Sequence, residues 1–377
     1  MHIGVIGGGI FGMATALELR SRGHEVTLCE RGTIPAADAS STDVSKAIRR
    51  IHYPEEEYIE LVTQAAQQWS NWQERSGSSF YHRPGFLSVS RAFPAESKVH
   101  GGHATLRRLG LEPESLSIEE ARRRFPQLVV KEGDTVFYDS WSGYLRSSEA
   151  MARLAEFARE DGVEIRQGTT IQEVDDRPEE VRLVSTDGHT VSCDRAIVSA
   201  GAWVTRLFPQ LQRHLRLTRQ QMAFFVPRDP AAFRREVFPV WSVLAPDDCW
   251  YGFPLLDEGY VKVAGDNRAH EADPESHREP TDEFLTQARE FVADRIPALA
   301  DGELVGGRSC FYTNTADEHF VVDWAPHSSR VLIAGCGSGH GFKFGGAIGP
   351  VIADAVEDRD NPLARLFKIG ERFGGNE

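Results

Sequence analysis

The sequence of 377 residues predicts an α/β fold in which a Rossmann-type dinucleotide-binding domain is interleaved with an α+β domain built on an antiparallel β-sheet. Three features predict this fold. A G-x-G-x-x-G turn follows a strand near the N-terminus, a glycine-rich turn follows a second buried strand near the C-terminus, and residues 216–266 between them are rich in Val, Phe, Trp and Tyr. Alternating strands and helices indicate a parallel sheet, whereas consecutive strands indicate an antiparallel one.

The first thirty residues have the order that a dinucleotide-binding unit requires. A strand at residues 3–6 leads into Gly7-Gly8-Gly9-Ile10-Phe11-Gly12, a helical pattern follows to Arg20, and a second strand ends at Glu30. We expect Gly7 to form the tight turn, Gly9 to admit a pyrophosphate and Gly12 to let the helix pack on the strand. The helix N-terminus would then face the phosphates with its unpaired N–H groups.

Glu30, at the end of the second strand, is expected to accept a hydrogen bond from a ribose hydroxyl. Its negative charge disfavours a 2′-phosphate and therefore NADP. The motif alone does not distinguish NAD from FAD. A glycine-rich surface turn is the alternative interpretation, and the register of strand, helix, second strand and acid argues against it.

The remaining sequence predicts a discontinuous nucleotide-binding domain interrupted by a second domain. We assign residues 1–80, 145–212 and 318–377 to the first domain, and residues 81–144 and 213–317 to the second. The expected helices cover residues 57–74, 118–124, 149–160, 281–296 and 349–356. The expected strands cover residues 86–89, 164–166, 171–174, 181–185 and 190–191, and a further apolar strand runs from Arg195 into a turn at Gly201.

Composition and charge restrict the partners of the chain. There are 42 basic and 56 acidic residues, which give a net charge of −14, so the overall field repels nucleic acid and anionic membranes. No apolar run approaches the ~20 residues that span a bilayer. Five widely spaced cysteines without a C-x-x-C pair disfavour a disulfide framework or a zinc site. We predict a cytoplasmic monomer or small homo-oligomer without a signal peptide, a metal, or a nucleic-acid or membrane partner.

The stretch from Val331 to Gly349 is the most informative part of the sequence. A buried strand opens into a loop with a glycine at nearly every second position, and a helix follows. Such a loop lets the backbone lie against a flat ligand, and a helix N-terminus behind it stabilises negative charge. Lys343 supplies a cation inside the loop. A solvated lysine on a flexible loop is the alternative, which the flanking Phe342 and Phe344 disfavour.

The motif Gly-Ser-Gly-His-Gly-Phe-Lys-Phe, residues 337–344, resembles the signature of the monomeric sarcosine oxidase family, a branch of the flavoenzymes similar to D-amino-acid oxidase. Two more motifs match this branch: residues 310–320, which include Cys-Phe-Tyr-Thr and Asp-Glu-His-Phe, and Tyr-Gly-Phe-Pro at 251–254, followed by Lys262. The N-terminal glycines and the segment 199–203 match as well, but the glycine motif is shared by many nucleotide folds. The resemblance covers essentially the whole chain.

The resemblance implies FAD as the cofactor, bound covalently through its 8α-methyl group to the cysteine at the position of Cys310. Composition alone favours a buried structural cysteine, although a thiol beside Arg308 would suit the covalent link. The residues that we expect to bind FAD are Gly7, Gly9, Ile10, Phe11, Gly12, Glu30, Arg31, Ser41, Thr42, Val174, Ala200, Gly201, Trp203, Cys310, Gly337, Gly339, His340, Gly341, Phe342 and Lys343.

Arg49 and Lys343 stand at positions that hold the substrate carboxylate in this family. A pair of cations in the cleft of an acidic protein suits this task, and arginine offers a bidentate fork. For Arg49, a solvated side chain at the start of a helix is the alternative. Tyr251 and Tyr312 match tyrosines that line the substrate cavity.

Three more residues are expected to take part in catalysis. Lys262 matches a lysine that acts near flavin N5 through water, where a cation stabilises developing superoxide; an exposed strand lysine is the alternative. Lys46 replaces an arginine of the sarcosine-oxidising members, in an Asp-x-x-Lys pattern from Asp43 that looks more like fructosyl-amino-acid oxidases. Asp266 replaces an active-site histidine and could pair with a substrate ammonium, with a second basic group or with Lys262.

The resemblance implies an enzyme that oxidises a secondary or N-substituted amino acid at its C–N bond. The product is an imine that hydrolyses, and O2 is reduced to H2O2. The departures at Lys46 and Asp266 indicate a substrate other than plain sarcosine. Three alternatives stay open: a dehydrogenase that passes electrons to a quinone or a protein, a fructosyl-amino-acid oxidase, and a flavin-binding subunit without turnover of its own.

Overall fold

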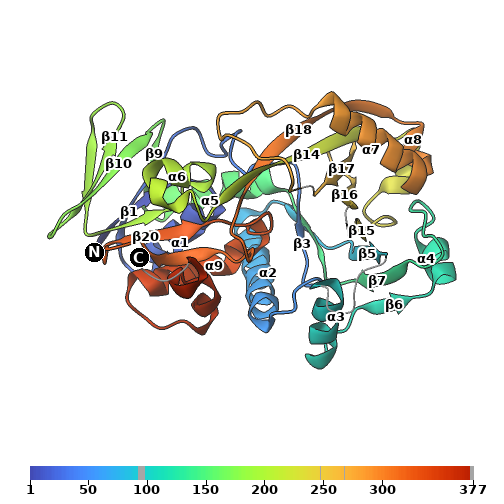
Figure 1. The fold of residues 1–377 in the computed structure, drawn as a ribbon, viewed down its shortest axis with the longest axis horizontal. Coiled ribbons are helices and arrows are strands. Elements are labelled where there is room, and N and C mark those ends of the chain that lie inside the picture. The colour runs from blue at the N-terminus through green and yellow to red at the C-terminus, as the bar shows by residue number, and fades with distance from the viewer. Residues whose placement is uncertain (92–97, 247, 267, 374–377) are drawn as a thin grey trace.

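The computed structural model describes residues 1–91, 98–246, 248–266 and 268–373. It has two large sheets at opposite ends of an elongated molecule, and both termini lie at the same end (Figure 1). The α/β fold class predicted from the sequence is confirmed. The predicted domain boundaries stay a prediction.

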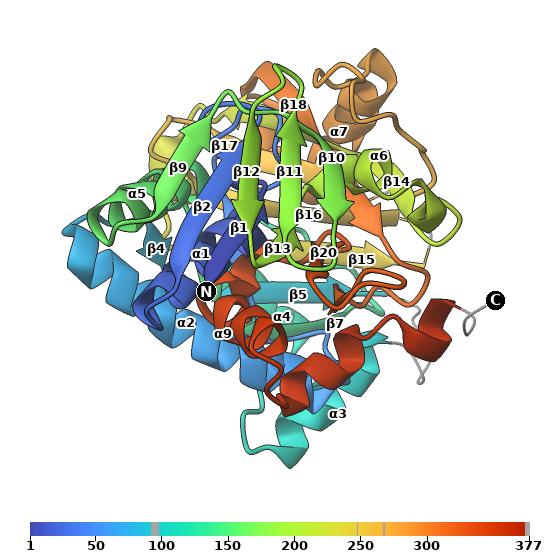
Figure 2. The same cartoon turned by 90° about the vertical axis from the view of Figure 1, so that its left-hand side faces the viewer.

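A six-stranded sheet forms the end that carries both termini (Figure 2). Its strand order is β19-β20-β13-β1-β2-β9, and all pairs are parallel except the edge pair β19–β20. The strands are β1 (His2–Ile6), β2 (Glu25–Glu30), β9 (Glu164–Gln167), β13 (Arg195–Val198), β19 (Val321–Trp324) and β20 (Val331–Gly335). Because side chains alternate along a strand, Val5 packs against helices on one face and Ile6 packs on the other.

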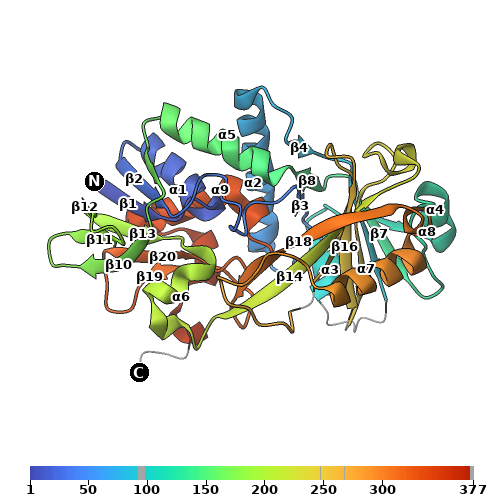
Figure 3. The same ribbon diagram turned by 90° about the horizontal axis from the view of Figure 1, so that it is seen from above.

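Helices cover one face of this sheet, and a small antiparallel sheet covers the other (Figures 2 and 3). The helices on this face are α1 (Ile10–Ser21), α5 (Ser147–Glu160) and α9 (Gly345–Val356), and α2 (Glu56–Ser76) packs on α9. The small sheet consists of β10 (Ile171–Asp176), β11 (Val181–Ser185) and β12 (Thr190–Cys193). This arrangement leaves the carboxyl ends of the parallel strands open, which is where ligands bind in such folds.

The start of α9 corrects a prediction. The sequence predicted a loop up to Gly349, whereas the helix already begins at Gly345. A Cβ atom at Gly345 would lie 2.3 Å from Ile10, one at Gly346 would lie 2.4 Å from the carbonyl of Ala65, and one at Gly349 would lie 2.6 Å from the carbonyl of Ala14. These three glycines therefore allow α9 to pack closely on α1 and α2 and do not form the ligand loop.

The second sheet has eight strands in the order β18-β14-β17-β16-β15-β5-β7-β6. All neighbours are antiparallel, as predicted, except for β15 and β5, which are parallel. The strands are β5 (Phe86–Ser90), β6 (Glu114–Leu116), β7 (Thr135–Asp139), β14 (Arg216–Val226), β15 (Val240–Ala245), β16 (Asp248–Leu255), β17 (Val261–Gly265) and β18 (Glu303–Asn314). One face, which carries Trp241 and Val263, packs against α7 (Asp282–Arg295). The other face is more polar and faces the candidate site.

The remaining elements connect the two large sheets. A three-stranded sheet of β3 (Lys46–Ile48), β8 (Gly143–Leu145) and β4 (Tyr81–His82) brings Lys46 between them. The other helices are α3 (Lys98–Arg108), α4 (Ile118–Arg124), α6 (Val204–Leu207) and α8 (Pro297–Ala300), and the 3-10 turns are η1 (Gly201–Trp203), η2 (Pro209–Leu211), η3 (Pro230–Phe233), η4 (Phe342–Phe344), η5 (Pro362–Phe367) and η6 (Gly370–Phe373). Within the described ranges, every helix is too short or too polar to cross a membrane.

Candidate active site

Two adjoining cavities lie where the parallel strands of the first sheet end and the second sheet begins. The larger has a volume of about 480 Å³ and the smaller a volume of about 120 Å³. Four residues line both cavities: Lys46, Tyr312, Gly339 and Phe342. A ligand in the larger cavity would therefore contact the walls of the smaller one.

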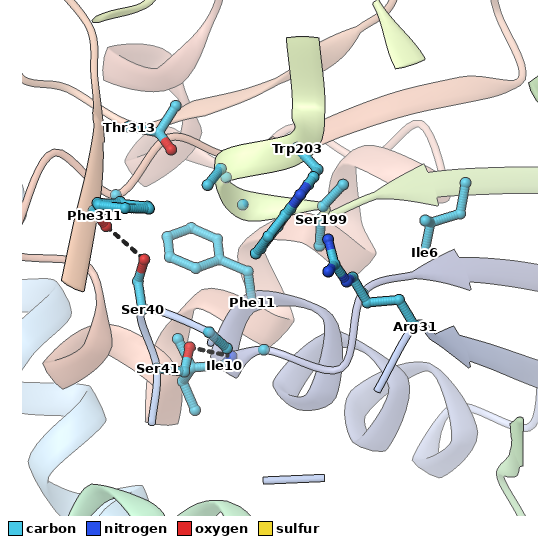
Figure 4. A pocket seen from close by; sticks show the side chains of 18 of the residues that line it. Ile6, Ile10, Phe11, Arg31, Ser40, Ser41, Ser199, Trp203, Phe311 and Thr313 are labelled. Carbon is cyan, nitrogen blue, oxygen red and sulfur yellow. Dashed lines mark hydrogen bonds between the residues drawn. The ribbon is translucent and has the colours of Figure 1, made fainter. Parts of the chain in front are cut away.

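The glycine turn and the N-terminus of α1 form one wall of the larger cavity (Figure 4). Gly7 has a φ of +104°, and a Cβ atom there would lie 2.4 Å from the carbonyl oxygen of Ser199. A Cβ atom at Gly12 would lie 2.0 Å from the carbonyl oxygen of Gly7. The N-cap residue Gly9 provides no side-chain cap, and Ile10 N donates to Ser41 Oγ at 2.9 Å. The turn thus brings backbone N–H groups to an open wall, as anion binding requires.

Glu30 and Trp203 lie farther along the larger cavity. The carboxylate of Glu30 is buried and accepts hydrogen bonds from Gly8 N at 2.7 Å and from Gly32 N at 2.9 Å. Figure 4 shows Trp203 beside Arg31, whose guanidinium lies 4.2 Å from the centre of the indole ring. Trp203 Nε1 donates to Glu275 at 2.6 Å. The segment that contains Glu275, between the second large sheet and α7, therefore also contributes to this wall.

Arg49 and Lys343 both line the smaller cavity. Lys343 Nζ donates to Tyr53 OH at 2.9 Å and to the carbonyl oxygen of His340 at 2.6 Å. Burial and the charge of Arg49 hold the pKa of Lys343 well below its ordinary value. Arg49 Nη1 donates to the carbonyl oxygen of Ile51 at 2.7 Å, and among the described residues no carboxylate pairs with Arg49 or Lys343. An anion in this cavity would supply the missing partner.

Two buried tyrosines line the smaller cavity and meet there. The hydroxyl groups of Tyr251 and Tyr312 lie 3.4 Å apart. Burial raises the pKa of both phenols above the ordinary value, so both stay neutral at physiological pH. They can therefore serve as neutral hydrogen-bonding groups.

A buried charged cluster links Lys262, Asp43 and Lys46. Lys262 Nζ donates to Asp43 at 2.5 Å and to the carbonyl oxygen of Ser45 at 2.9 Å, and Lys46 lies 3.3 Å from the same carboxylate. Burial opposes ionisation of Asp43, but the two lysines outweigh it and lower its pKa to about 2. Burial lowers the pKa of Lys262 to about 8, against the attraction of Asp43. Asp43 therefore forms ion pairs with two lysines, and one of them, Lys46, lines both cavities.

Asp266 lines the smaller cavity but does not pair with Lys262, one of the partners considered above. Its carboxylate lies 3.4 Å from Arg268, which also pairs with Glu318. Burial lowers the pKa of Arg268, but Asp266 and Glu318 outweigh it and raise the value. Of the three partners considered for Asp266, the structure thus shows a second basic group of the protein, Arg268.

Several residues predicted to bind the cofactor or to act in catalysis lie outside the linings of both cavities. Gly12 packs inside α1, Val174 packs in the small sheet's core, and Thr42 and Lys262 are buried behind the walls. His340 and Lys343 line the smaller cavity instead of the larger one. Cys310 is buried on β18, and its neighbours Phe311, Tyr312 and Thr313 line the larger cavity. The other predicted cofactor-binding residues line the larger cavity: Gly7, Gly9, Ile10, Phe11, Glu30, Arg31, Ser41, Ala200, Gly201, Trp203, Gly337, Gly339, Gly341 and Phe342.

The model of a family described as "FAD dependent oxidoreductase" (DAO) matches residues 2–355, nearly the whole chain. The chain belongs to this family. Its resemblance to the sarcosine oxidase branch agrees with similar curated proteins. Monomeric sarcosine oxidase of Bacillus sp. (strain B-0618) is 29% identical over 97% of this chain and 94% of its own length. N-methyl-L-tryptophan oxidase of Yersinia pestis (strain Pestoides F) is 26% identical over 95% of each chain.

Solved structures confirm the fold of this FAD dependent oxidoreductase. NikD, described as an unusual amino acid oxidase essential for nikkomycin biosynthesis, matches 97% of this chain and 96% of its own with a TM-score of 0.83 at 22% identity. Amadoriase I from Aspergillus fumigatus, a fructosyl amine:oxygen oxidoreductase, matches 97% of this chain and 89% of its own with a TM-score of 0.80 at 23% identity. At these identities the similarity shows the fold alone.

The larger cavity fits the FAD that members of this family use. The N-terminus of α1 would face the pyrophosphate, Glu30 the ribose, and the loop that contains Gly337, Gly339 and Gly341 the flavin ring. Ser199 Oγ is buried in the cavity wall and has no hydrogen-bond partner among the described residues, which leaves it available to a ligand.

Two buried residues that hold lysines of the site, Asp43 and Tyr53, were not predicted from the sequence as site residues. The sequence indicated Asp43 only as part of an Asp-x-x-Lys pattern. Its neighbours in sequence do not predict its contact with Lys262, which is 219 residues away. Tyr53, which accepts the hydrogen bond from Lys343, carried no sequence signal. Both contacts join elements that are distant in sequence.

Gly12→Ala is expected to destabilise the protein and to reduce its FAD content. The new Cβ atom would collide with the backbone of Gly7, and overpacking of this kind costs about 1–3 kcal/mol. The measurements are the thermal unfolding midpoint and the ratio of flavin absorbance to protein. Gly32→Ala is the control, because its Cβ atom would meet only Glu30 and Ala36 at ordinary contact distances. Wild-type values for Gly12→Ala would contradict the assignment of this turn.

Proposed function

We propose that this protein is an oxidase of secondary or N-substituted amino acids. It oxidises the C–N bond of the substrate to an imine, which water hydrolyses, and it reduces O2 to H2O2. The observation that carries the proposal is the pair of unpaired cations, Arg49 and Lys343, in the cavity that adjoins the FAD cavity. The names of similar proteins, monomeric sarcosine oxidase and N-methyl-L-tryptophan oxidase, support the same substrate class.

The charges of the smaller cavity orient the substrate and select its protonation state. Arg49 and Lys343 bind the carboxylate, with the fork of the arginine fixing its plane. The lining contains three cations, Arg49, Lys343 and Lys46, and one acid, Asp266, whose charge Arg268 offsets. This excess of positive charge repels an ammonium group, so the amine is bound in its neutral form. A neutral amine has the lone pair that loss of the α-hydrogen as hydride requires.

FAD, when bound, would accept a hydride from the carbon bonded to the amine nitrogen, so that the C–N bond becomes C=N as the nitrogen loses its proton, and would pass the two electrons to O2 to give H2O2. The chain's own contribution to the second step is the cluster of Lys262, Lys46 and Asp43. An ammonium group has three N–H donors, and Asp43 and Ser45 accept two of those of Lys262. The remaining donor and the fixed charge would stabilise superoxide as it forms.

The test is O2 consumption and H2O2 production by the FAD-loaded protein with a panel of amines. The panel contains sarcosine, N-methyl amino acids, iminodiacids, pipecolate and fructosyl amino acids. Turnover with any N-substituted amino acid and formation of one H2O2 per substrate would support the proposal. Turnover only with an artificial electron acceptor would indicate a dehydrogenase, and no anaerobic flavin bleaching with any amine would indicate a flavin-binding subunit.

Fructosyl amino acids are the second candidate substrates. The observation that favours them is the Asp43-x-x-Lys46 pattern, whose two side chains form an ion pair at the junction of the cavities. These substrates are also secondary amines with a carboxylate, so the clamp of Arg49 and Lys343 would hold them in the same way. Their relative kcat/KM in the panel decides between the two classes.

Covalent attachment of FAD to Cys310 is part of the proposal. The thiol lies in the motif that resembles the family's attachment site, and the next three residues line the larger cavity. Flavin absorbance is therefore expected to precipitate with the acid-denatured wild-type protein and to appear in the supernatant of Cys310→Ala. Cys249→Ala, in another strand of the same sheet, serves as the control and should retain its flavin. Yellow supernatant from the wild type would contradict the covalent link.

A further inference from the structure

The second sheet contributes a buried polar group without a hydrogen-bond partner to the lining of the smaller cavity. Ser242 lines it, is only 3% exposed, and its Oγ has no hydrogen-bond partner among the described residues. A buried hydroxyl without a partner is costly and is typically satisfied by a ligand or by ordered water. Phe86 and Leu244, which lie on the same face of the sheet as Ser242, also line the cavity.

The sheet explains why a serine stands at this position. In the register of β15, Ser242 lies opposite Ser88 on β5 and opposite Tyr251 on β16, so the three side chains share one face. The neighbouring Trp241 and Val243 point to the other face, where they belong to the apolar core beneath α7. Ser242 therefore faces the cavity as a consequence of strand alternation.

The neighbours of Ser242 are also polar but uncharged. Ser88 Oγ and His52 Nε2 are 2.8 Å apart, and His52 lines the same cavity. Burial, together with the charges of Arg49 and Lys343, holds the pKa of His52 well below its ordinary value, so the ring is neutral. The charged groups of the lining are the clamp cations, Lys46 and the compensated Asp266.

We infer that Ser242 is a specificity-determining residue that hydrogen-bonds a neutral polar group of the substrate, a hydroxyl or a carboxamide at the end of a short carbon chain. The carbon chain of the substrate would pack on Phe86 and Leu244, while its carboxylate would bind to Arg49 and Lys343. The inference rests on the proposed function, because it assumes that the smaller cavity receives the amino acid.

The test compares two non-oxidisable carboxylates that differ only in a hydroxyl and a methyl group, 4-hydroxybutyrate and valerate. Each is titrated into the FAD-loaded protein, and binding is read from the perturbation of the flavin spectrum. We expect 4-hydroxybutyrate to bind about tenfold more tightly than valerate to the wild type, and the ratio to fall to about one or below in Ser242→Ala. Ser90→Ala is the matched control, since Ser90 lies on the same face of β5 and outside both cavity linings.

Binding does not depend on oxidation, so this test separates the inference from the proposed function. A wild-type ratio within twofold of one, a ratio that Ser242→Ala leaves unchanged, or binding of neither carboxylate would each overturn the inference. If the protein also oxidises amines, the same preference is expected in kcat/KM for N-(2-hydroxyethyl)glycine over N-propylglycine, and it should again disappear in Ser242→Ala.

Discussion

Lys343→Met is expected to lower kcat/KM for N-substituted amino acids by about 10²-fold to 10³-fold, because truncating one partner of a buried charge pair costs about 3–4 kcal/mol. Lys343 is buried, lines the smaller cavity and has only neutral partners, Tyr53 and the carbonyl of His340. Because Lys343 has no anionic partner among the described residues, a bound substrate carboxylate would supply one. The measurement is steady-state kinetics with the best amine of the panel.

The pH dependence of the same site gives an independent check. Because burial and Arg49 lower the pKa of Lys343, only its protonated form binds a carboxylate well, and affinity is expected to fall as pH rises. Lys343→Met should show a weaker fall. Lys131→Met is the control, because Lys131 pairs with Asp294 at the surface. A decrease of kcat/KM by less than threefold in Lys343→Met would contradict the proposal that Lys343 binds the substrate carboxylate.

Lys262→Met is expected to slow reoxidation of the reduced protein by O2 about 10²-fold to 10³-fold, the usual effect of removing one preorganised charge or donor. Reduction by the amine should change only a few-fold, since the amine is held by Arg49 and Lys343 in the smaller cavity, whose lining does not include Lys262. Stopped-flow absorbance separates the two half-reactions. Because the pKa of Lys262 is about 8, the wild-type rate of reoxidation should fall as pH rises through that value, and the variant should lose this dependence.

Lys262→Met is also expected to be less stable, because Asp43 would keep only Lys46 as a partner; breaking a buried pair costs about 3–5 kcal/mol. Adding Asp43→Asn removes the uncompensated charge and should recover part of this stability. The double variant should still reoxidise slowly. Recovery of fast reoxidation in the double variant would show that Lys262 acts only through stability.

Local patterns were sufficient to predict most of the first sheet. The G-x-G-x-x-G turn, the following helix and Glu30 depend on neighbours in sequence, and the structure places them together at the larger cavity. The resemblance to the sarcosine oxidase family indicated Arg49 and Lys343, which line the smaller one. Arg50, one residue farther, instead forms hydrogen bonds with the buried Asp139 through two nitrogens.

Contacts between distant elements could not be predicted in the same way. The pairing of Lys262 with Asp43 and that of Arg268 with Glu318 depend on how β17 and the residues after it meet the rest of the fold. The glycines at 345, 346 and 349 have the composition of a ligand loop, and only the helices packed against them show that they serve close packing. Ser242 carries no motif, and its place in the cavity follows from sheet register.

The central claim is that the smaller cavity presents an N-substituted amino acid, held by its carboxylate, to the FAD in the larger one. The most direct test is anaerobic flavin reduction by N-methyl-L-alanine, compared with the N-methylamide of the same amino acid, which lacks the carboxylate. We predict rapid bleaching by the acid, bleaching at least about 10²-fold slower by the amide, and return of the oxidised spectrum on adding O2. Equal rates of bleaching by both compounds, or no bleaching by N-methyl-L-alanine or any other amino acid of the panel, would contradict the account.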